Sequence, residues 1–246
     1  MNFIELFKSP SLIAAHRGFS YFSPENTLRA LKYSLGRCDF VEIDVQLSCD
    51  KKAVIFHDET LQRTTNINKP LKVYELSYED LFKLDYGSWF DGIYEPLLDL
   101  ETALEFGKEY RLPLNIELKD ISEFCEDAEF VSIVVDLIEK FEMQDAVLLS
   151  SFRHEYLALI KQMQPKILTA VLVEDKLPEN PIDYLLSLGA IAYNISNELV
   201  NEEVVRNLRE QNIFVNVYTI NDKTRAKELF EIGVNAIFSD TLTASN

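Results

Sequence analysis

The chain has 246 residues, enough for one large domain with a full hydrophobic core. Its residues are 47% hydrophobic, which argues against extensive disorder, and no apolar run approaches the ~18 residues that would span a bilayer. The formal net charge of −17 repels nucleic acid and anionic membrane surfaces, so we expect no nucleic-acid partner and no stable membrane association.

Short apolar runs rich in Val and Ile alternate with segments of helical period along most of the chain. Strands are predicted at residues 12–16, 40–47, 53–57, 114–119, 146–152, 167–173, 191–195, 213–218 and 236–239. Helices are predicted at residues 127–141, 154–163, 182–188 and 224–232, and an earlier helix is expected to begin at Pro24 with Ser23 as its N-cap. This alternation predicts an α/β fold with a mainly parallel sheet.

A distorted (β/α)8 TIM barrel accounts for this pattern better than an open nucleotide-binding sheet. No glycine-rich phosphate-binding motif follows a strand. The charged residues fall near the C-terminal ends of strands, where such a barrel places its site. The connection at residues 48–52 is too short for a helical crossover and is typical of a hairpin turn. We therefore expect the barrel to be irregular around its second and third strands.

Residues 60–97 do not fit the alternation of strands and helices. The segment is longer than a normal connection and is rich in aromatic residues. A loop of this length usually has its own structure or covers a site. Ser77, with Asp80 three residues later, predicts a short helix that ends near Leu84. We expect a small inserted subdomain over the barrel mouth, after the third strand of a single domain that spans residues 1–246.

Charged side chains interrupt two of the apolar strands. Glu42 and Asp44 share one face of one strand, and Glu117 and Lys119 share one face of another, because side chains alternate across a strand. Burying the three carboxylates without partners would cost roughly several kcal/mol each. A divalent cation with oxygen ligands would neutralise them. An ion-pair network with Arg17 and Lys119 is the structural alternative, but it leaves excess negative charge.

Two of the three histidines, His16 and His57, end predicted strands. Arg17 follows the first, so this strand end brings a titratable ring and a fixed cation to the barrel rim. Histidine suits acid–base catalysis because its unperturbed pKa is about 6.5. The third histidine, His154, begins a helix, and we expect it to be an ordinary surface residue.

The cysteines and the N-terminal residues bear on location. Cys38, Cys49 and Cys125 are scattered and form no Cys-x-x-Cys pair, which is typical of reduced structural thiols. The first residues lack the charged start, long apolar stretch and cleavage site of a secretory signal. We expect a cytoplasmic protein, and the sequence does not indicate its oligomeric state.

The chain resembles the glycerophosphodiester phosphodiesterase family in five motifs. They occur in the order His16-Arg17-Gly18, Pro24-Glu25-Asn26-Thr27, Glu42-x-Asp44, His57-Asp58 and Glu117-x-Lys119. The match is dense over residues 12–65 and 115–119 and thinner at residues 150–152 and 217–221 and near the C-terminal end. Any one motif is weak, whereas five together are specific.

The resemblance implies a distorted (β/α)8 barrel with an inserted small domain. It implies metal-dependent hydrolysis of deacylated phospholipids to glycerol 3-phosphate and an alcohol, which belongs to lipid and glycerol metabolism. The implied cofactor is one divalent cation, Ca²⁺ or Mg²⁺, with Mn²⁺ as a further candidate. The implied metal ligands are Glu42, Asp44 and Glu117, and the implied acid–base pair is His16 and His57. Residues implied or considered for binding substrate or phosphate are Arg17, Lys119, Glu25, Asn26, Phe152 and Tyr218.

The chain departs from the family pattern at two places. Tyr218-Thr219 replaces a common Trp-Thr pair, and the closing motif lacks the usual proline after Asp240. Both changes put the substrate preference in doubt, not the reaction. The leaving alcohol, the roles of acid and base, and the first nucleophile (the glycerol 2-hydroxyl or water) stay open.

Two other functions compete with hydrolysis to glycerol 3-phosphate. A phosphoinositide-type phospholipase C would stop at a cyclic phosphate and should carry a basic or apolar surface for lipid. A catalytically silent barrel that binds a phosphorylated ligand should have lost a histidine or a metal carboxylate. The sequence shows neither feature.

Overall fold

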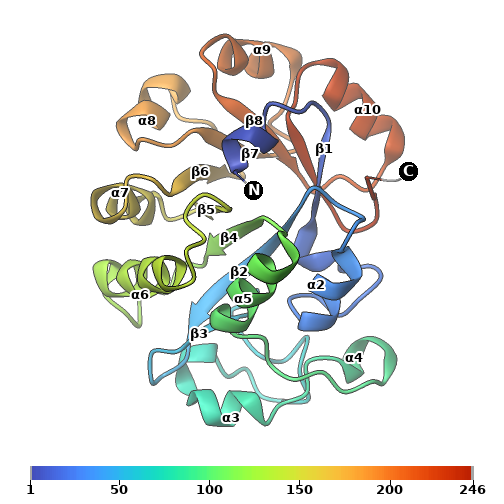
Figure 1. Ribbon diagram of the computed structural model, residues 1–246, viewed down its shortest axis with the longest axis vertical. Coiled ribbons are helices and arrows are strands. Elements are labelled where there is room, and N and C mark those ends of the chain that lie inside the picture. Colours follow the sequence, from blue (N-terminus) through green and yellow to red (C-terminus); the bar gives the residue numbers. More distant parts are fainter. Residues whose placement is uncertain (1, 245–246) are drawn as a thin grey trace.

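The computed structural model describes residues 2–244, which form a (β/α)8 barrel (Figure 1). The ring consists of parallel strands β1 (Leu12–Ala15), β2 (Phe40–Leu47), β4 (Leu114–Leu118), β5 (Val147–Ser151), β6 (Leu168–Val173), β7 (Ala192–Ser196), β8 (Phe214–Tyr218) and β9 (Ala236–Ser239). Strand β1 pairs with both β2 and β9, and these pairings close the ring. The predicted fold class is confirmed.

The distortion expected near the second and third strands is present. Strand β3 (Ala53–Ile55) pairs antiparallel with β2 and lies outside the ring, because β2 also pairs with β1 and β4. The Ser48 N–H donates to the Lys52 carbonyl at 3.0 Å and closes the predicted hairpin turn.

Helices surround the ring (Figure 1). They are α2 (Leu28–Ser34), α5 (Leu100–Tyr110), α6 (Asp127–Lys140), α7 (His154–Met163), α8 (Pro181–Ser187), α9 (Glu202–Glu210) and α10 (Lys223–Glu231). The short helix α1 (Phe3–Leu6) instead covers one end of the barrel interior. Outward strand residues such as Val41, Ile43 and Ile116 are buried in the large core cluster, which also contains apolar side chains of α5, α6 and α7. Within residues 2–244, no helix has both the length and the apolar character needed to cross a membrane.

The barrel interior changes from apolar to charged along the strands. Phe3 and Phe7 pack against inward residues of the first layer, which includes Phe40 and Leu148. A polar layer follows, in which hydrogen bonds link the side chains of Asn115, Ser150, Asn194 and Asn216. The carboxylates of β2 and β4 lie at and beyond this layer, because Glu42 is in register with Asn115 and Asp44 with Glu117. The interior is therefore apolar in the first layer and polar at the C-terminal ends of the strands, where the site lies.

The predicted start of the helix α2 is wrong. It begins at Leu28, not at Pro24, and Thr27 is its N-cap, whose side chain accepts a hydrogen bond from the Ala30 N–H. Asn26 has a φ of 58°, in the left-handed region, so a helix cannot run through it. The turn before α2 is thereby free to direct Glu25 and Asn26 toward the strand ends.

The segment between β3 and α5 forms its own small structure beside α2 and α5 (Figure 1). It contains η2 (Val73–Glu75), α3 (Tyr78–Phe82) and α4 (Ser88–Asp91). The predicted N-cap is present, since the Ser77 side chain accepts a hydrogen bond from the Asp80 N–H. A separate apolar cluster fills this part of the chain and consists of Val54, Phe56, Leu61, Val73, Leu81, Tyr86 and Leu97. The part of the segment that follows His57 flanks the barrel mouth and is not among the lining residues of the cavity there.

Candidate active site

A cavity of about 520 Å³ opens at the C-terminal ends of the strands. It is lined by predicted site residues that lie on six strands or directly after them, namely His16, Arg17, Glu42, His57, Glu117, Lys119, Phe152 and Tyr218. Asp44, Glu25 and Asn26 do not line it and lie behind these side chains. The structure therefore brings the predicted residues together, and three of them lie outside the cavity lining.

Three carboxylates form a buried group on β2 and β4. Oxygen atoms of Glu42, Asp44 and Glu117 lie within 4.8 Å of one another. One oxygen of each is held: the Arg17 backbone N–H donates to Glu42 Oε2 at 2.9 Å, Asn26 Nδ2 to Asp44 Oδ2 at 2.8 Å and Lys119 Nζ to Glu117 Oε1 at 2.7 Å. Asp44 Oδ1 is buried and has no hydrogen-bond partner among the described residues.

The pKa values of these carboxyl groups diverge because they repel one another. Burial, Asp44 and Glu117 raise the pKa of Glu42 well above its ordinary value, and burial and Asp44 also raise the pKa of Glu117. Burial opposes the charge of Asp44, but Lys119, His57 and Arg17 outweigh it and lower the pKa of Asp44 to about 2. A hard divalent cation suits this set of oxygen donors, since it would remove the repulsion and give Asp44 Oδ1 a partner.

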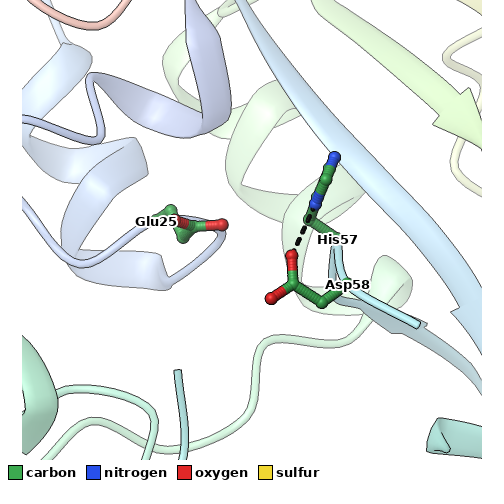
Figure 2. Close-up of side chains that lie close together, drawn as sticks. All are labelled: Glu25, His57 and Asp58. Carbon is green, nitrogen blue, oxygen red and sulfur yellow. Dashed lines mark hydrogen bonds and ion pairs between the residues drawn. The ribbon is translucent and has the colours of Figure 1, made fainter. Parts of the chain in front are cut away.

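Both cavity histidines are held through Nδ1 by an aspartate. His16 Nδ1 lies 2.7 Å from Asp240 Oδ1, and His57 Nδ1 lies 2.7 Å from Asp58 Oδ1 (Figure 2). Ser20 Oγ also donates to Asp240 Oδ1, at 2.5 Å. Within residues 2–244 neither Nε2 atom has a hydrogen-bond partner, so both are available to a ligand in the cavity, as acid–base chemistry requires.

Cations lie beside the carboxylates. Arg17 Nη1 donates to Glu25 Oε1 at 2.9 Å, and Lys119 Nζ lies 3.6 Å from Asp44 Oδ1. Arg17 Nε is buried, lies 3.8 Å from Asp44 Oδ2 and has no hydrogen-bond partner among the described residues. These two cations therefore combine a fixed position with remaining capacity to bind an anion.

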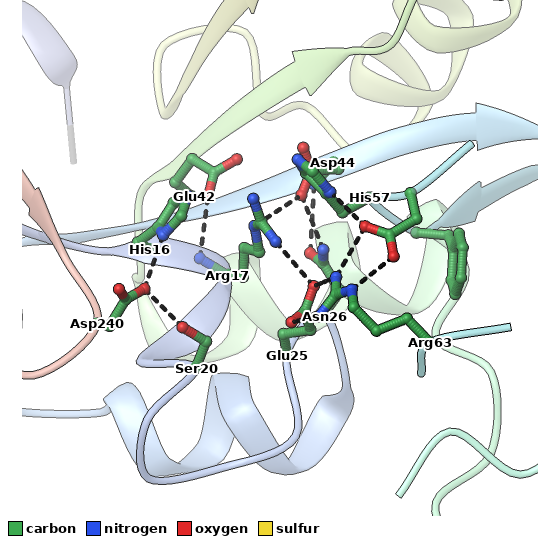
Figure 3. A network of polar contacts seen from close by, with 12 residues as sticks. His16, Arg17, Ser20, Glu25, Asn26, Glu42, Asp44, His57, Arg63 and Asp240 are labelled. Carbon is green, nitrogen blue, oxygen red and sulfur yellow. Dashed lines mark hydrogen bonds and ion pairs between the residues drawn. The ribbon is translucent and has the colours of Figure 1, made fainter. Parts of the chain in front are cut away.

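A second group of side chains that could bind a metal already has an arginine side chain between its carboxylates. Glu25, His57 and Asp58 have ligand atoms within 4.8 Å of one another (Figure 2). The guanidinium of Arg63, however, lies between the Glu25 and Asp58 carboxylates and pairs with both (Figure 3). This group is an ion-pair network, and we assign no metal to it.

Aromatic and apolar side chains complete the cavity. Phe152 and Tyr218 meet edge to face, with ring centroids 6.3 Å apart. The Tyr218 hydroxyl donates to the Val173 carbonyl at 2.8 Å, which fixes the ring. Both residues lie where the sequence placed them, in the lining of the candidate pocket.

Sequence reasoning did not assign the partners of the histidines. The sequence patterns assigned no role to Asp240, which directly follows β9, or to Arg63. The expectation for His154 is wrong. Its ring is half-buried, with Nδ1 2.7 Å from the Tyr184 hydroxyl and Nε2 2.9 Å from the Leu172 carbonyl, so it joins α7 to β6 and α8.

Comparison with known proteins shows which family this chain resembles over nearly its whole length. Residues 16–244 match the model of the Glycerophosphoryl diester phosphodiesterase family. A glycerophosphodiester phosphodiesterase of Bacillus altitudinis is 36% identical over 93% of this chain and 94% of its own length, and one of Bacillus subtilis (strain 168) is 30% identical over 93% and 83%. A phosphodiesterase of Oleispira antarctica, solved in complex with the product sn-glycerol-3-phosphate, superposes with a TM-score of 0.87 at 32% identity, covering 96% of this chain and 95% of its own.

Proposed function

This chain belongs to the glycerophosphoryl diester phosphodiesterase family and is an enzyme that hydrolyses glycerophosphodiesters, and from that premise we propose which of its residues bind the metal, bind the phosphate and transfer protons. The products are glycerol 3-phosphate and an alcohol. The sn-glycerol-3-phosphate in the related Oleispira antarctica enzyme supports this product. We also propose that residues 1–246 form one domain, with the inserted subdomain at about residues 60–97.

We propose that Glu42, Asp44 and Glu117 hold one divalent cation. The observation that carries the proposal is the buried Asp44 Oδ1 atom, which has no hydrogen-bond partner within residues 2–244. When bound, the cation supplies positive charge that stabilises the phosphoryl oxygens in the transition state. Ca²⁺ and Mg²⁺ both suit carboxylate oxygens, and Mn²⁺ is the third candidate.

Arg17 and Lys119 bind the phosphate oxygens in this proposal. Both line the cavity and are already neutralised in part by Glu25 and Glu117, so an incoming phosphodiester meets fixed cations that need little reorganisation. Asn26 holds Asp44, and Glu25 holds Arg17, so these two residues support the site from behind.

His16 and His57 exchange the protons. Attack at phosphorus requires a base that removes a proton from the attacking hydroxyl, and departure of the alcohol requires an acid. One histidine takes each role through Nε2, while Asp240 and Asp58 hold the opposite ring nitrogens. The hydroxyl that attacks first belongs either to the substrate glycerol or to water. Phe152 and Tyr218 form a wall against the organic part of the substrate.

Release of glycerol 3-phosphate from glycerophosphocholine and glycerophosphoethanolamine tests this function. We expect turnover that EDTA abolishes and that one of Ca²⁺, Mg²⁺ or Mn²⁺ restores, with glycerol 3-phosphate as the final product in phosphorus NMR. A cyclic phosphate as the final product would favour the phospholipase C-like reaction. Folded protein without turnover under any of the ions would favour a ligand-binding barrel. The expected cytoplasmic location and the absence of membrane or nucleic-acid partners stay predictions.

A further inference from the structure

Arg63 occupies a central place between two acidic side chains of the site (Figure 3). Its Nε and Nη2 atoms lie 2.6 and 2.8 Å from the two Asp58 oxygens. Its Nη1 and Nη2 atoms lie 2.7 and 2.6 Å from the two Glu25 oxygens. The guanidinium therefore makes a two-point pair with each carboxylate, a geometry that adds specificity as well as energy.

Each of these carboxylates holds a residue of the proposed reaction. Asp58 contacts His57 Nδ1 at 2.7 Å, and Glu25 accepts from Arg17 Nη1 at 2.9 Å. We propose that Arg63 is a positioning residue for the phosphodiesterase reaction, because it fixes the acid–base histidine His57 and the phosphate-binding Arg17 relative to each other. This inference rests on the proposed function of these two residues.

The inserted subdomain holds the backbone on both sides of Arg63. Leu61 is fully buried in the apolar cluster of the insertion, and its N–H donates to the Leu71 carbonyl at 2.9 Å. Thr65 is 8% exposed, and its Oγ1 donates to the Leu61 carbonyl at 2.5 Å. Although the Arg63 side chain is 46% exposed, the contacts of Leu61 and Thr65 fix the backbone from which it extends. The Arg63 side chain thus links the insertion to the barrel site.

Arg63 also contributes to the charge balance of the site. Five carboxylates gather at this side of the mouth: Glu25, Glu42, Asp44, Asp58 and Glu117. One divalent ion together with Arg17, Lys119 and Arg63 would balance them. Without the guanidinium, the Asp58 and Glu25 carboxylates would lose their shared partner and repel each other, and both would be free to reorient.

Arg63→Gln and Arg63→Lys test this role, with Arg29→Gln as a matched control. Arg29 also joins the barrel to the insertion, since it pairs with Asp91 at 2.9 Å and Glu95 at 3.1 Å, but these are not the carboxylates that hold His57 and Arg17. We expect Arg63→Gln to lower kcat for glycerophosphocholine by about 10- to 100-fold, the usual cost of losing such a supporting contact. Arg63→Lys should fall between this variant and wild type, because an ammonium cannot pair with both carboxylates at two points each. Arg29→Gln should stay within about twofold of wild type.

A double-mutant cycle separates positioning from general destabilisation. In an Asp58→Asn background, Arg63→Gln should cost less activity than in wild type, because one of its two carboxylate partners is already lost. Wild-type kcat and KM in Arg63→Gln, fully multiplicative losses in the cycle, or an equal loss in Arg29→Gln would each overturn the inference. Wild-type turnover in the same assay tests the proposed function separately, so failure of that function would be seen in the wild-type enzyme itself.

Discussion

His16 and Asp240 lie 224 residues apart in the sequence, and His16 Nδ1 lies 2.7 Å from Asp240 Oδ1. Closure of the barrel produces this contact, because β1 pairs with β9 and places Ala15 in register with Ser239. The residues that follow these two positions then meet at the mouth. His57 obtains the equivalent contact from its chain neighbour Asp58. Asp240, which is distant in the sequence, thus orients the His16 ring, and the adjacent residue Asp58 orients the His57 ring.

Asp240→Asn should reduce turnover without weakening metal binding. The amide cannot stabilise a protonated His16 ring as the carboxylate does, so acid–base catalysis should fall by about 100- to 1000-fold, the lower part of the range that such catalysis contributes. Steady-state kcat and calorimetric Mn²⁺ affinity measure the two effects. Asp136→Asn, at an exposed position on α6, is the control and should match wild type in both. Loss of Mn²⁺ binding in Asp240→Asn would contradict this account of His16.

The same pair should stabilise the protein in a pH-dependent way. Burial opposes the charge of Asp240, but the hydrogen bond and charge of His16 prevail and hold the Asp240 pKa far below its ordinary value. A carboxyl group with a depressed pKa in the folded state contributes stability above its unfolded pKa of about 3.9 and loses it as the pH falls toward the folded value. The difference in unfolding free energy between wild type and Asp240→Asn should therefore shrink between about pH 6 and about pH 3. Urea unfolding at both pH values measures it, and a constant difference would count against the assignment.

Metal affinity should increase with pH. Burial and neighbouring carboxylates raise the pKa of Glu42 well above its ordinary value, and burial and Asp44 raise that of Glu117, so protons compete with a cation for these ligands. Binding should release protons, and the Mn²⁺ dissociation constant should rise as the pH falls from about 8 to about 6. Calorimetry in buffers of different ionisation enthalpy counts the released protons. An affinity independent of pH would show that the cation does not displace protons from this group.

Much of the fold and site followed from local sequence patterns. The alternation of side chains predicted that Glu42 and Asp44 share one face of a strand and that Glu117 lies on one face with Lys119, and in the structure oxygen atoms of the three carboxylates lie within 4.8 Å of one another. The strand-end positions of His16 and His57 also brought both rings into one cavity. Their catalytic and metal-binding roles stay predictions until they are measured.

Other features could not be predicted from local sequence patterns. The contact between His16 and Asp240 depends on barrel closure, and the position of Arg63 depends on how the insertion packs its own core. Helix α1 has four residues, too few for a recognisable period, so the seal formed by Phe3 and Phe7 was missed. The highly charged helix α9 was missed because only a few apolar positions mark its buried stripe.

Metal-dependent turnover by wild type and Asp44→Asn tests the central claim most directly. Both proteins would be stripped with EDTA, checked for folding, supplied with Mn²⁺ or Mg²⁺ and assayed for glycerol 3-phosphate release from glycerophosphocholine. We predict that wild type binds one ion per chain and regains activity, whereas Asp44→Asn loses high-affinity binding and at least about 100-fold in turnover. Full turnover by the stripped wild type, or wild-type activity and metal binding in Asp44→Asn, would contradict the assignment of this site.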